Sequence, residues 1–107
     1  RDKMSKLLQV DFTYTGPFGD EMAVMLKDLA KSINQEPGFI WKIWTENQQT
    51  ELGGGIYLFE NEQSAQSYLA MHSARLQKMG ITNIRGQVFD INQDLSMINH
   101  GPVQTEY

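Results

Sequence analysis

The chain has 107 residues, of which 40% are hydrophobic and 21% charged, and this length and composition predict a single globular domain. The formal net charge of −4, without a basic block, argues against nucleic acid as a partner, and the absence of cysteine excludes disulfides and thiolate metal sites. No stretch approaches the roughly 18 apolar residues of a membrane span, and the first residues, RDKMSKLLQ, contain no apolar signal core, so we expect a cytoplasmic protein without membrane contact.

The first predicted elements are a strand and a helix. Residues alternate in polarity from Leu7 to Tyr14, and this period of two is typical of a strand. Apolar residues then recur at a helical spacing: Met22, Met25, Leu26, Leu29 and Ile33. We therefore expect one helix that is capped by Asp20 and ends before Pro37.

Two extended runs follow, at Phe39 to Glu46 and at Ile56 to Glu60. The short polar stretch between them implies an antiparallel hairpin. If the chain turns at Gln48-Gln49, Trp44 lies opposite Gly53. A register error of one residue would exchange the two faces of the hairpin.

A second helix is predicted between Asn61 and Gly80, because Asn61 can cap its first turn and glycine commonly ends a helix. Its apolar stripe, flanked by Tyr68, consists of Ala65, Leu69, His72, Leu76 and Met79. A last strand is expected at about Asn83 to Asn92. The weakly patterned tail from Gln93 to Tyr107 is expected to wrap the surface or a partner.

The predicted order is β-α-β-β-α-β, an α+β arrangement of the ferredoxin-like type, with a four-stranded antiparallel sheet and two helices on one face. A sheet with one face in water should alternate cleanly between apolar and polar residues. The two hairpin strands instead carry apolar residues on both sides: Phe39, Trp41, Ile43, Ile56 and Leu58 on one, and Ile40, Trp44, Tyr57 and Phe59 on the other. We therefore predict a homodimer in which a second subunit covers the bare face.

The run ELGGGIYLFE at residues 51–60 places three glycines directly before a strand. A phosphate-binding loop needs a helix after its glycines and, in the Walker form, a Lys-Ser/Thr pair, so that interpretation fails. Glycine within a strand often marks the close approach of another group. We expect a hollow in the sheet beside Trp44 and Tyr57; the alternative is that the indole ring fills the space above the glycines.

His72 and Arg75 are the candidate catalytic residues. His72 lies on the apolar stripe of the second helix, so its ring should face the sheet, where a histidine of near-neutral pKa could accept a proton from a phenol. Arg75, one turn further on, could stabilise a developing oxyanion. The alternatives are a core histidine bonded to a backbone carbonyl and an arginine on a solvated helix face.

Three aromatic residues, Trp41, Trp44 and Tyr57, are the candidate substrate-binding residues, because they could line a pocket for an aromatic compound. Packing in the core or at a dimer interface is the alternative for each. The two histidines, His72 and His100, are far apart in sequence and no cysteine is present, so we expect no metal site. No Ser-His-Asp pattern or nucleophile elbow is visible.

Four runs of the chain, FTYTGPFGD, SINQEPGFIWKIWTE, GGGIYLFENEQSAQSYL and VFDINQDLSMIN, closely resemble the YdhR-type mono-oxygenases. These are small bacterial proteins of the dimeric α+β barrel superfamily, which also contains the antibiotic-biosynthesis mono-oxygenases. The resemblance covers about Met4 to Asn99, which we take as the domain, with residues 100–107 as a C-terminal tail. It implies a homodimer whose two sheets meet as a barrel, and oxygenation of aromatic compounds without metal, flavin or haem.

We therefore expect a cofactor-independent mono-oxygenase that takes dioxygen and a small phenol- or hydroquinone-like substrate. The substrate would lie against Trp41, Trp44 or Tyr57, His72 would remove its proton, and the resulting anion would react with dioxygen in a desolvated pocket. Haem-degrading relatives use an asparagine on the first strand, which residues 7–14 lack. The alternatives are a dimer that binds a small molecule without turnover and a lactone isomerase like other members of the superfamily.

Overall fold

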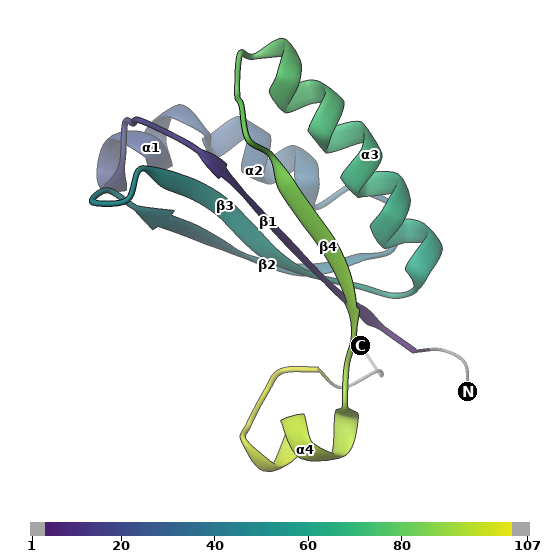
Figure 1. Ribbon diagram of the computed structural model, residues 1–107. Helices are drawn as coiled ribbons and strands as arrows, with labels where there is room; N and C mark the ends of the chain where they lie inside the picture. The colour runs from purple at the N-terminus through teal and green to yellow at the C-terminus, as the bar shows by residue number, and fades with distance from the viewer. Residues whose placement is uncertain (1–3, 104–107) are drawn as a thin grey trace.

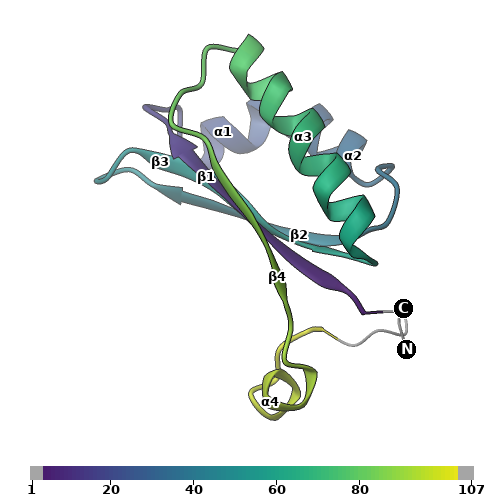
Figure 2. The same cartoon turned by 45° about the vertical axis from the view of Figure 1, so that its right-hand side comes forward.

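The computed structural model describes residues 4–103 and contains one antiparallel sheet with helices packed on one face (Figure 1, Figure 2). The strands, in the spatial order β2-β3-β1-β4, are β1 (Lys6–Thr13), β2 (Phe39–Asn47), β3 (Leu52–Phe59) and β4 (Arg85–Asp90). The helices are α1 (Gly19–Met25), α2 (Lys27–Ile33), α3 (Glu62–Lys78) and α4 (Gln93–Ile98). This arrangement confirms the predicted α+β, ferredoxin-like fold.

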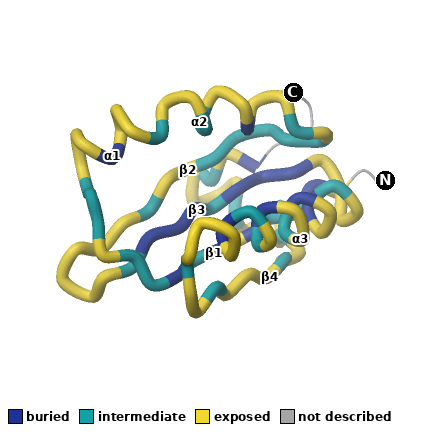
Figure 3. Tube along the Cα trace, turned by 90° about the horizontal axis from the view of Figure 1, so that it is seen from above, coloured by how far each residue is buried: buried dark blue, intermediate teal, exposed yellow. Residues whose placement is uncertain are grey.

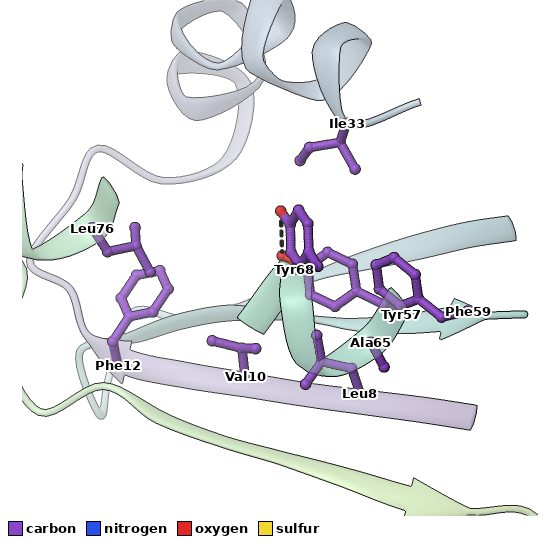
Figure 4. Close-up of a cluster of buried hydrophobic side chains, with 9 residues drawn as sticks. All are labelled: Leu8, Val10, Phe12, Ile33, Tyr57, Phe59, Ala65, Tyr68 and Leu76. Carbon is purple, nitrogen blue, oxygen red and sulfur yellow. Dashed lines mark hydrogen bonds between the residues drawn. The ribbon is translucent and has the colours of Figure 1, made fainter. Parts of the chain in front are cut away.

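The core lies between the sheet and the layer formed by α1, α2 and α3, while α4 stands apart beyond the end of β4 (Figure 1). Burial is concentrated along β1, β3 and the sheet-facing side of α3 (Figure 3). The buried cluster in Figure 4 consists of Leu8, Val10, Phe12, Ile33, Tyr57, Phe59, Ala65, Tyr68 and Leu76. Within it the Tyr57 and Tyr68 hydroxyls lie 3.3 Å apart and share a hydrogen bond.

The segment predicted as a single first helix forms two short helices. They meet at Leu26, whose φ of −102° and ψ of 13° depart from helical values. Backbone hydrogen bonds continue through the bend, from the Leu26 amide to Met22 O and from the Ala30 amide to Leu26 O, each 2.9 Å long. Met22 and Ile33 are buried as predicted, but Met25 is 54% exposed, although it contributes to the wall of the cavity between the helices and the sheet.

The predicted N-cap of this segment is wrong. Phe18 occupies the cap position without a side-chain hydrogen bond, and Asp20 lies in the first turn, where its charge favours the helix dipole. The Gly19 amide instead donates to Oε1 of Glu46, 2.9 Å away at the end of β2. A side chain distant in sequence thus supplies the acceptor that Asp20 was expected to provide.

The β2–β3 hairpin is confirmed, but its register differs from the prediction by two residues. Trp44 lies opposite Gly55, and the predicted partner Gly53 lies opposite Glu46. Because side chains alternate with a period of two, a shift of two residues leaves the faces unchanged. Trp44, Gly55 and Tyr57 therefore share the helix-facing side, as the sequence predicted.

An irregularity near the start of β2 changes the predicted face of one aromatic residue. Phe39 pairs with Phe59, whereas Trp41 pairs with Leu58, so Ile40 is an extra residue in β2. Phe39 therefore joins Phe59 against the core, with the two ring centroids 6.1 Å apart. The prediction that Phe39 and Trp41 share a face is wrong for this reason.

The second predicted helix is confirmed as α3. Its Asn61 cap accepts a hydrogen bond of 2.8 Å from the Ser64 amide, and Gly80 adopts a φ of +85° just beyond the helix. The last strand is shorter than predicted, at Arg85–Asp90, and a short helix, α4, forms at the start of the weakly patterned tail, where no helix was predicted. None of the helices between residues 4 and 103 combines the length and apolar character needed to cross a membrane.

The sheet face opposite α1, α2 and α3 carries apolar side chains, as the pattern of the hairpin strands predicted. The strand registers place Trp41, Ile43, Ile56, Leu58 and Phe89 there. The tail lies against part of this face, since the Trp41 indole donates a 2.9 Å hydrogen bond to the Pro102 carbonyl and Val103 is buried. Ile43 remains 53% exposed. Residues 104–107 of the predicted tail lie outside the described residues.

Candidate functional site

A small cavity of about 60 Å³ lies between the helix layer and the sheet. His72 from α3, Lys42 and Trp44 from β2 and Tyr57 from β3 contribute to its wall. A wider, more open groove of about 340 Å³ adjoins it. The two spaces have three wall residues in common: Met22, Leu26 and Trp44. The inner cavity and the groove are therefore neighbours at the bend between α1 and α2.

His72 faces the sheet, as its place on the apolar stripe predicted, and is only 4% exposed. Its Nδ1 lies 3.0 Å from Nη2 of Arg75, one turn further along α3. A guanidinium can only donate hydrogen bonds, so Nδ1 accepts and the proton of the neutral ring is on Nε2. The Tyr68 ring stacks against the imidazole, with the two centroids 5.1 Å apart. His72 is thus oriented as a donor through Nε2.

The charge state of His72 differs from the expected near-neutral pKa. Burial, followed by the positive charges of Arg75 and Lys42, lowers its pKa from 6.5 to about 3. The ring is therefore neutral at physiological pH. A base of such low pKa, with one nitrogen already occupied, is poorly suited to take a proton from a phenol. The geometry favours His72 as a hydrogen-bond donor over the predicted role of base.

Lys42 is the functional candidate that sequence reasoning missed. Its side chain extends from the middle of β2 toward the helices, and Nζ lies 3.2 Å from the centroid of Trp44 and 4.7 Å from that of Tyr57. Burial and then the charge of Arg75 lower the pKa of Lys42 from 10.5 to about 7. Near neutral pH a substantial share of this side chain is thus the free amine, which can accept a proton.

The sequence contained a signal for Lys42. It is a single cation between Ile40 and Trp44 on the side of β2 assigned to Trp44 and Tyr57, where a charged residue needs a reason. The glycine run provides the space for it, because a Cβ at Gly55 would lie 2.6 Å from Lys42 Cε. Much of the hollow expected above the glycines is therefore filled by a lysine, and neither sequence interpretation foresaw this.

Three polar groups lie together beside His72: the hydroxyls of Tyr57 and Tyr68 and the guanidinium of Arg75. Nη2 of Arg75 lies 3.5 Å from the Tyr68 hydroxyl, which in turn contacts the Tyr57 hydroxyl. Burial raises the pKa of both tyrosines, so both hydroxyls stay protonated at neutral pH. Arg75 Nε is buried without a hydrogen-bond partner among the described residues.

The structure brings four of the five predicted site residues together. Trp44, Tyr57 and His72 line the cavity, and Arg75 lies behind His72. Trp41 is on the opposite face of the sheet, bonded to Pro102 as described above, so it has no access to this cavity. Within residues 4–103, no cluster of three or more histidine and carboxylate side chains is arranged to hold a metal ion.

The fold matches solved structures of oxygenases. SnoaB, a cofactor-independent oxygenase from Streptomyces nogalater, superposes with a TM-score of 0.59 at 16% identity, over 83% of this chain and 94% of that one. A protein from Deinococcus radiodurans described as a "putative antibiotic biosynthesis monooxygenase" gives 0.53 at 13% identity, over 83% and 93%. At these identities the similarity concerns the fold. This places the protein in the class of ferredoxin-like α+β domains found in such oxygenases.

The family within this class follows from the sequence. Residues 7–102 match the family model described as "Putative mono-oxygenase ydhR", which is almost the whole chain. The protein belongs to the ydhR mono-oxygenase family, as the resemblance of its sequence indicated. A search of curated proteins found no match.

Proposed function

We propose that the protein is a mono-oxygenase that needs no cofactor and acts on small phenol- or hydroquinone-like compounds. The observation that carries the proposal is the small cavity between sheet and helices, where a donor, Nε2 of His72, and an amine of lowered pKa, Lys42, lie among aromatic rings. The name of the family and the likeness of the fold to SnoaB support oxygenation as the reaction.

The sizes of the two spaces suggest how a substrate lies. The inner cavity of about 60 Å³ is smaller than the cavity of about 150 Å³ that holds benzene in an engineered protein core. A hydroxyl group or dioxygen fits such a space, and the adjoining groove of about 340 Å³ has room for an aromatic ring. We therefore place the substrate hydroxyl near Lys42 and the ring along Trp44 in the groove.

In this arrangement Lys42 accepts the proton of the substrate hydroxyl. His72, held by Arg75, donates from Nε2 to the resulting oxyanion, and the guanidinium adds positive potential. Arg75 acts through His72 and is a positioning residue. Burial of the site strengthens these interactions and gives dioxygen an apolar place next to the anion.

The electron-rich anion is the reductant, so no further co-reactant is needed. For a hydroquinone, one oxygen atom of dioxygen bonds to a ring carbon, the other leaves as water, and the ring is oxidised to a hydroxyquinone. The substrate supplies all the electrons that reduce dioxygen. The protein contributes proton transfer, desolvation and orientation.

We also propose that the protein works as a homodimer. Ile43 and Phe89, which are 53% and 37% exposed, leave an apolar area on the outer face of the sheet. In α4, which projects away from the sheet (Figure 2), Leu95 and Ile98 are 60% and 71% exposed. A second copy packed against this face would cover both areas.

Dioxygen uptake by the purified protein with a dihydroxynaphthalene, after treatment with a chelator, tests the activity. We expect uptake that saturates with substrate, and its near-complete loss in Lys42→Met. His72→Ala should lower kcat by about 10²–10³-fold, the usual cost of removing one oxyanion donor. Lys78→Gln, which removes an exposed charge from the same helix, should change neither kcat nor KM.

The same assay separates the two alternative functions. Saturable binding without dioxygen uptake across a panel of phenols would show a binding protein. Turnover of a lactone under anaerobic conditions would show an isomerase. Unchanged uptake in Lys42→Met would contradict the assigned proton acceptor, even if the activity itself were present.

A further inference from the structure

Two cationic side chains lie close together at this site without a carboxylate between them. Lys42 from β2 lines the inner cavity, and Arg75 from α3 lies behind His72, near enough for its charge to add to burial in lowering the pKa of Lys42. No aspartate or glutamate lines the inner cavity. The ion pairs found within residues 4–103 lie elsewhere, at Lys6–Asp90 and between Arg85 and Asp11. Neither cation thus forms an ion pair among the described residues. Burial and then the charge of Glu36 raise the pKa of Tyr68, so Glu36 is the acidic residue whose charge reaches this cluster.

The neighbouring tyrosines and His72 do not supply negative charge. Tyr57 from β3 and Tyr68 from α3 stay protonated because burial raises the pKa of each, and burial followed by the charge of Glu46 does the same for Tyr14 after β1. His72 stays neutral. Glu46 lies at the outer groove, where it accepts a hydrogen bond from the Gly19 amide.

A buried ammonium without a carboxylate beside it is costly, and the nearby guanidinium adds positive potential, so the site favours any anion that can reach Lys42. We infer that this cavity is a binding site for an anionic head group, and that its ligands are small organic acids, carboxylates or phenolates, with an apolar body. The inference rests on the proposed function only in that it takes the same cavity as the substrate site.

The shape of the site fits this class of ligand. The inner cavity has room for a carboxylate or phenolate oxygen beside Lys42 and Nε2 of His72. The outer groove is lined mainly by apolar side chains, among them Met22, Leu26 and Trp44, and suits the apolar body. The phenolate formed in the proposed reaction is itself such an anion. One site would therefore bind an organic acid and stabilise the phenolate of the reaction.

Binding of benzoate, compared with benzyl alcohol as a neutral analogue of similar size, tests the inference. The measurement uses the full chain under anaerobic conditions and follows tryptophan fluorescence in a Trp41→Phe background, so that Trp44 at the site reports. We expect benzoate to bind about tenfold more tightly than benzyl alcohol, because hydrogen bonds to charged groups contribute more than neutral ones.

Variants and pH identify the groups responsible. Lys42→Met should abolish the preference for benzoate while retaining benzyl alcohol, Arg75→Gln should reduce it, and Lys78→Gln should leave it unchanged. Because the pKa of Lys42 is about 7, raising the pH from one unit below to one unit above this value should weaken benzoate binding by about tenfold.

Equal affinity for the two probes, absence of benzoate binding, or an undiminished preference in Lys42→Met would overturn the inference. Benzoate binding without dioxygen uptake would leave the anion site in place and remove the oxygenase activity. Dioxygen uptake without a preference for benzoate would leave the oxygenase activity in place and remove the anion site.

Discussion

Lys42 occupies a position that the surrounding residues make apolar. Its neighbours toward the helices are Trp44, Tyr57 and the space above Gly55, and no described carboxylate pairs with it. The aromatic faces favour its charged form, whereas burial and Arg75 oppose it, and the pKa of about 7 shows that the opposing effects dominate. A side chain held in this way costs stability and gains reactivity.

Replacing Lys42 should therefore stabilise the fold. We expect Lys42→Met to raise the free energy of unfolding at pH 7 by about 1–4 kcal/mol, because a buried unpaired cation is removed. The native protein should also gain stability between pH 7 and about pH 9, since its unfolded chain binds the Lys42 proton that the folded state has lost. Urea denaturation at each pH checks both, and a destabilised variant would contradict the assigned environment.

Arg75 should set the pH dependence of the reaction. Dioxygen uptake is expected to rise as the pH passes through about 7, when the Lys42 ammonium loses its proton. Removing the neighbouring charge in Arg75→Gln should raise the pKa of Lys42, so the rising limb of kcat/KM should move to higher pH. In Lys78→Gln the rising limb of kcat/KM should stay at the native pH. If it also stays there in Arg75→Gln, a group other than Lys42 controls it.

At the level of elements, β3 and α3 position the site together. The glycines of β3 serve two different purposes, because alternate residues face opposite sides of the sheet. A Cβ at Gly55 would meet the flexible end of Lys42, whereas a Cβ at Gly54 would meet the backbone carbonyl oxygen of Val10 in β1. One glycine leaves room for a functional side chain, and the other allows two strands to approach.

These purposes predict different outcomes for the same substitution. Gly54→Ala should lower the free energy of unfolding by about 3 kcal/mol or more, because the backbone of β1 cannot yield, whereas Gly55→Ala should cost less than about 1 kcal/mol. Gly55→Ala should nevertheless reduce dioxygen uptake, since it displaces the Lys42 amine. Urea denaturation and the uptake assay measure the two effects. Equal losses of stability would contradict this division of roles.

The elements also show which features local sequence could predict. The periods of two and 3.6 in the residue pattern predicted the strands and the α3 stripe with His72, and the short polar link between two extended runs predicted the antiparallel hairpin. The bend at Leu26, the extra residue Ile40 and the capping of α1 by Glu46 depend on contacts between segments. Such contacts leave no periodic signal, so the helix break and the face of Phe39 were not predicted.

For the site, sequence patterns predicted orientation better than chemistry. The faces of Trp44, Tyr57 and His72 followed from alternation and helical spacing. The bond that Arg75 makes to Nδ1, and the low pKa values of His72 and Lys42, follow from burial and proximity in three dimensions. Trp41 lies on the outer face because its parity opposes that of Trp44, although both were proposed for one pocket.

On the scale of the whole molecule, the two faces of the sheet differ in what covers them. The inner face is covered by three helices, and the outer face only in part, by the described end of the tail. The apolar side chains left on the outer face are an ordinary feature of an interface between copies and a costly one in a monomer. The inner face carries the proposed chemistry, so assembly and catalysis would use opposite sides.

A charge on the outer face should therefore separate the subunits. We expect Ile43→Glu to elute and scatter light as a monomer, because a carboxylate on this face would lose its hydration in a dimer. Val24→Glu, at an α1 position that is 78% exposed, should keep the molecular mass in solution of the native dimer. A native protein that is already monomeric at micromolar concentration, or an unaffected Ile43→Glu, would contradict the proposed dimer.

The most direct test of cofactor-free mono-oxygenation is mass spectrometry of the product formed under ¹⁸O-labelled dioxygen by chelator-treated protein. The proposed reaction predicts a hydroxyquinone that carries one labelled oxygen atom, at a rate that collapses in Lys42→Met and not in Lys78→Gln. A product without label, or labelled product formed equally well by Lys42→Met, would contradict it.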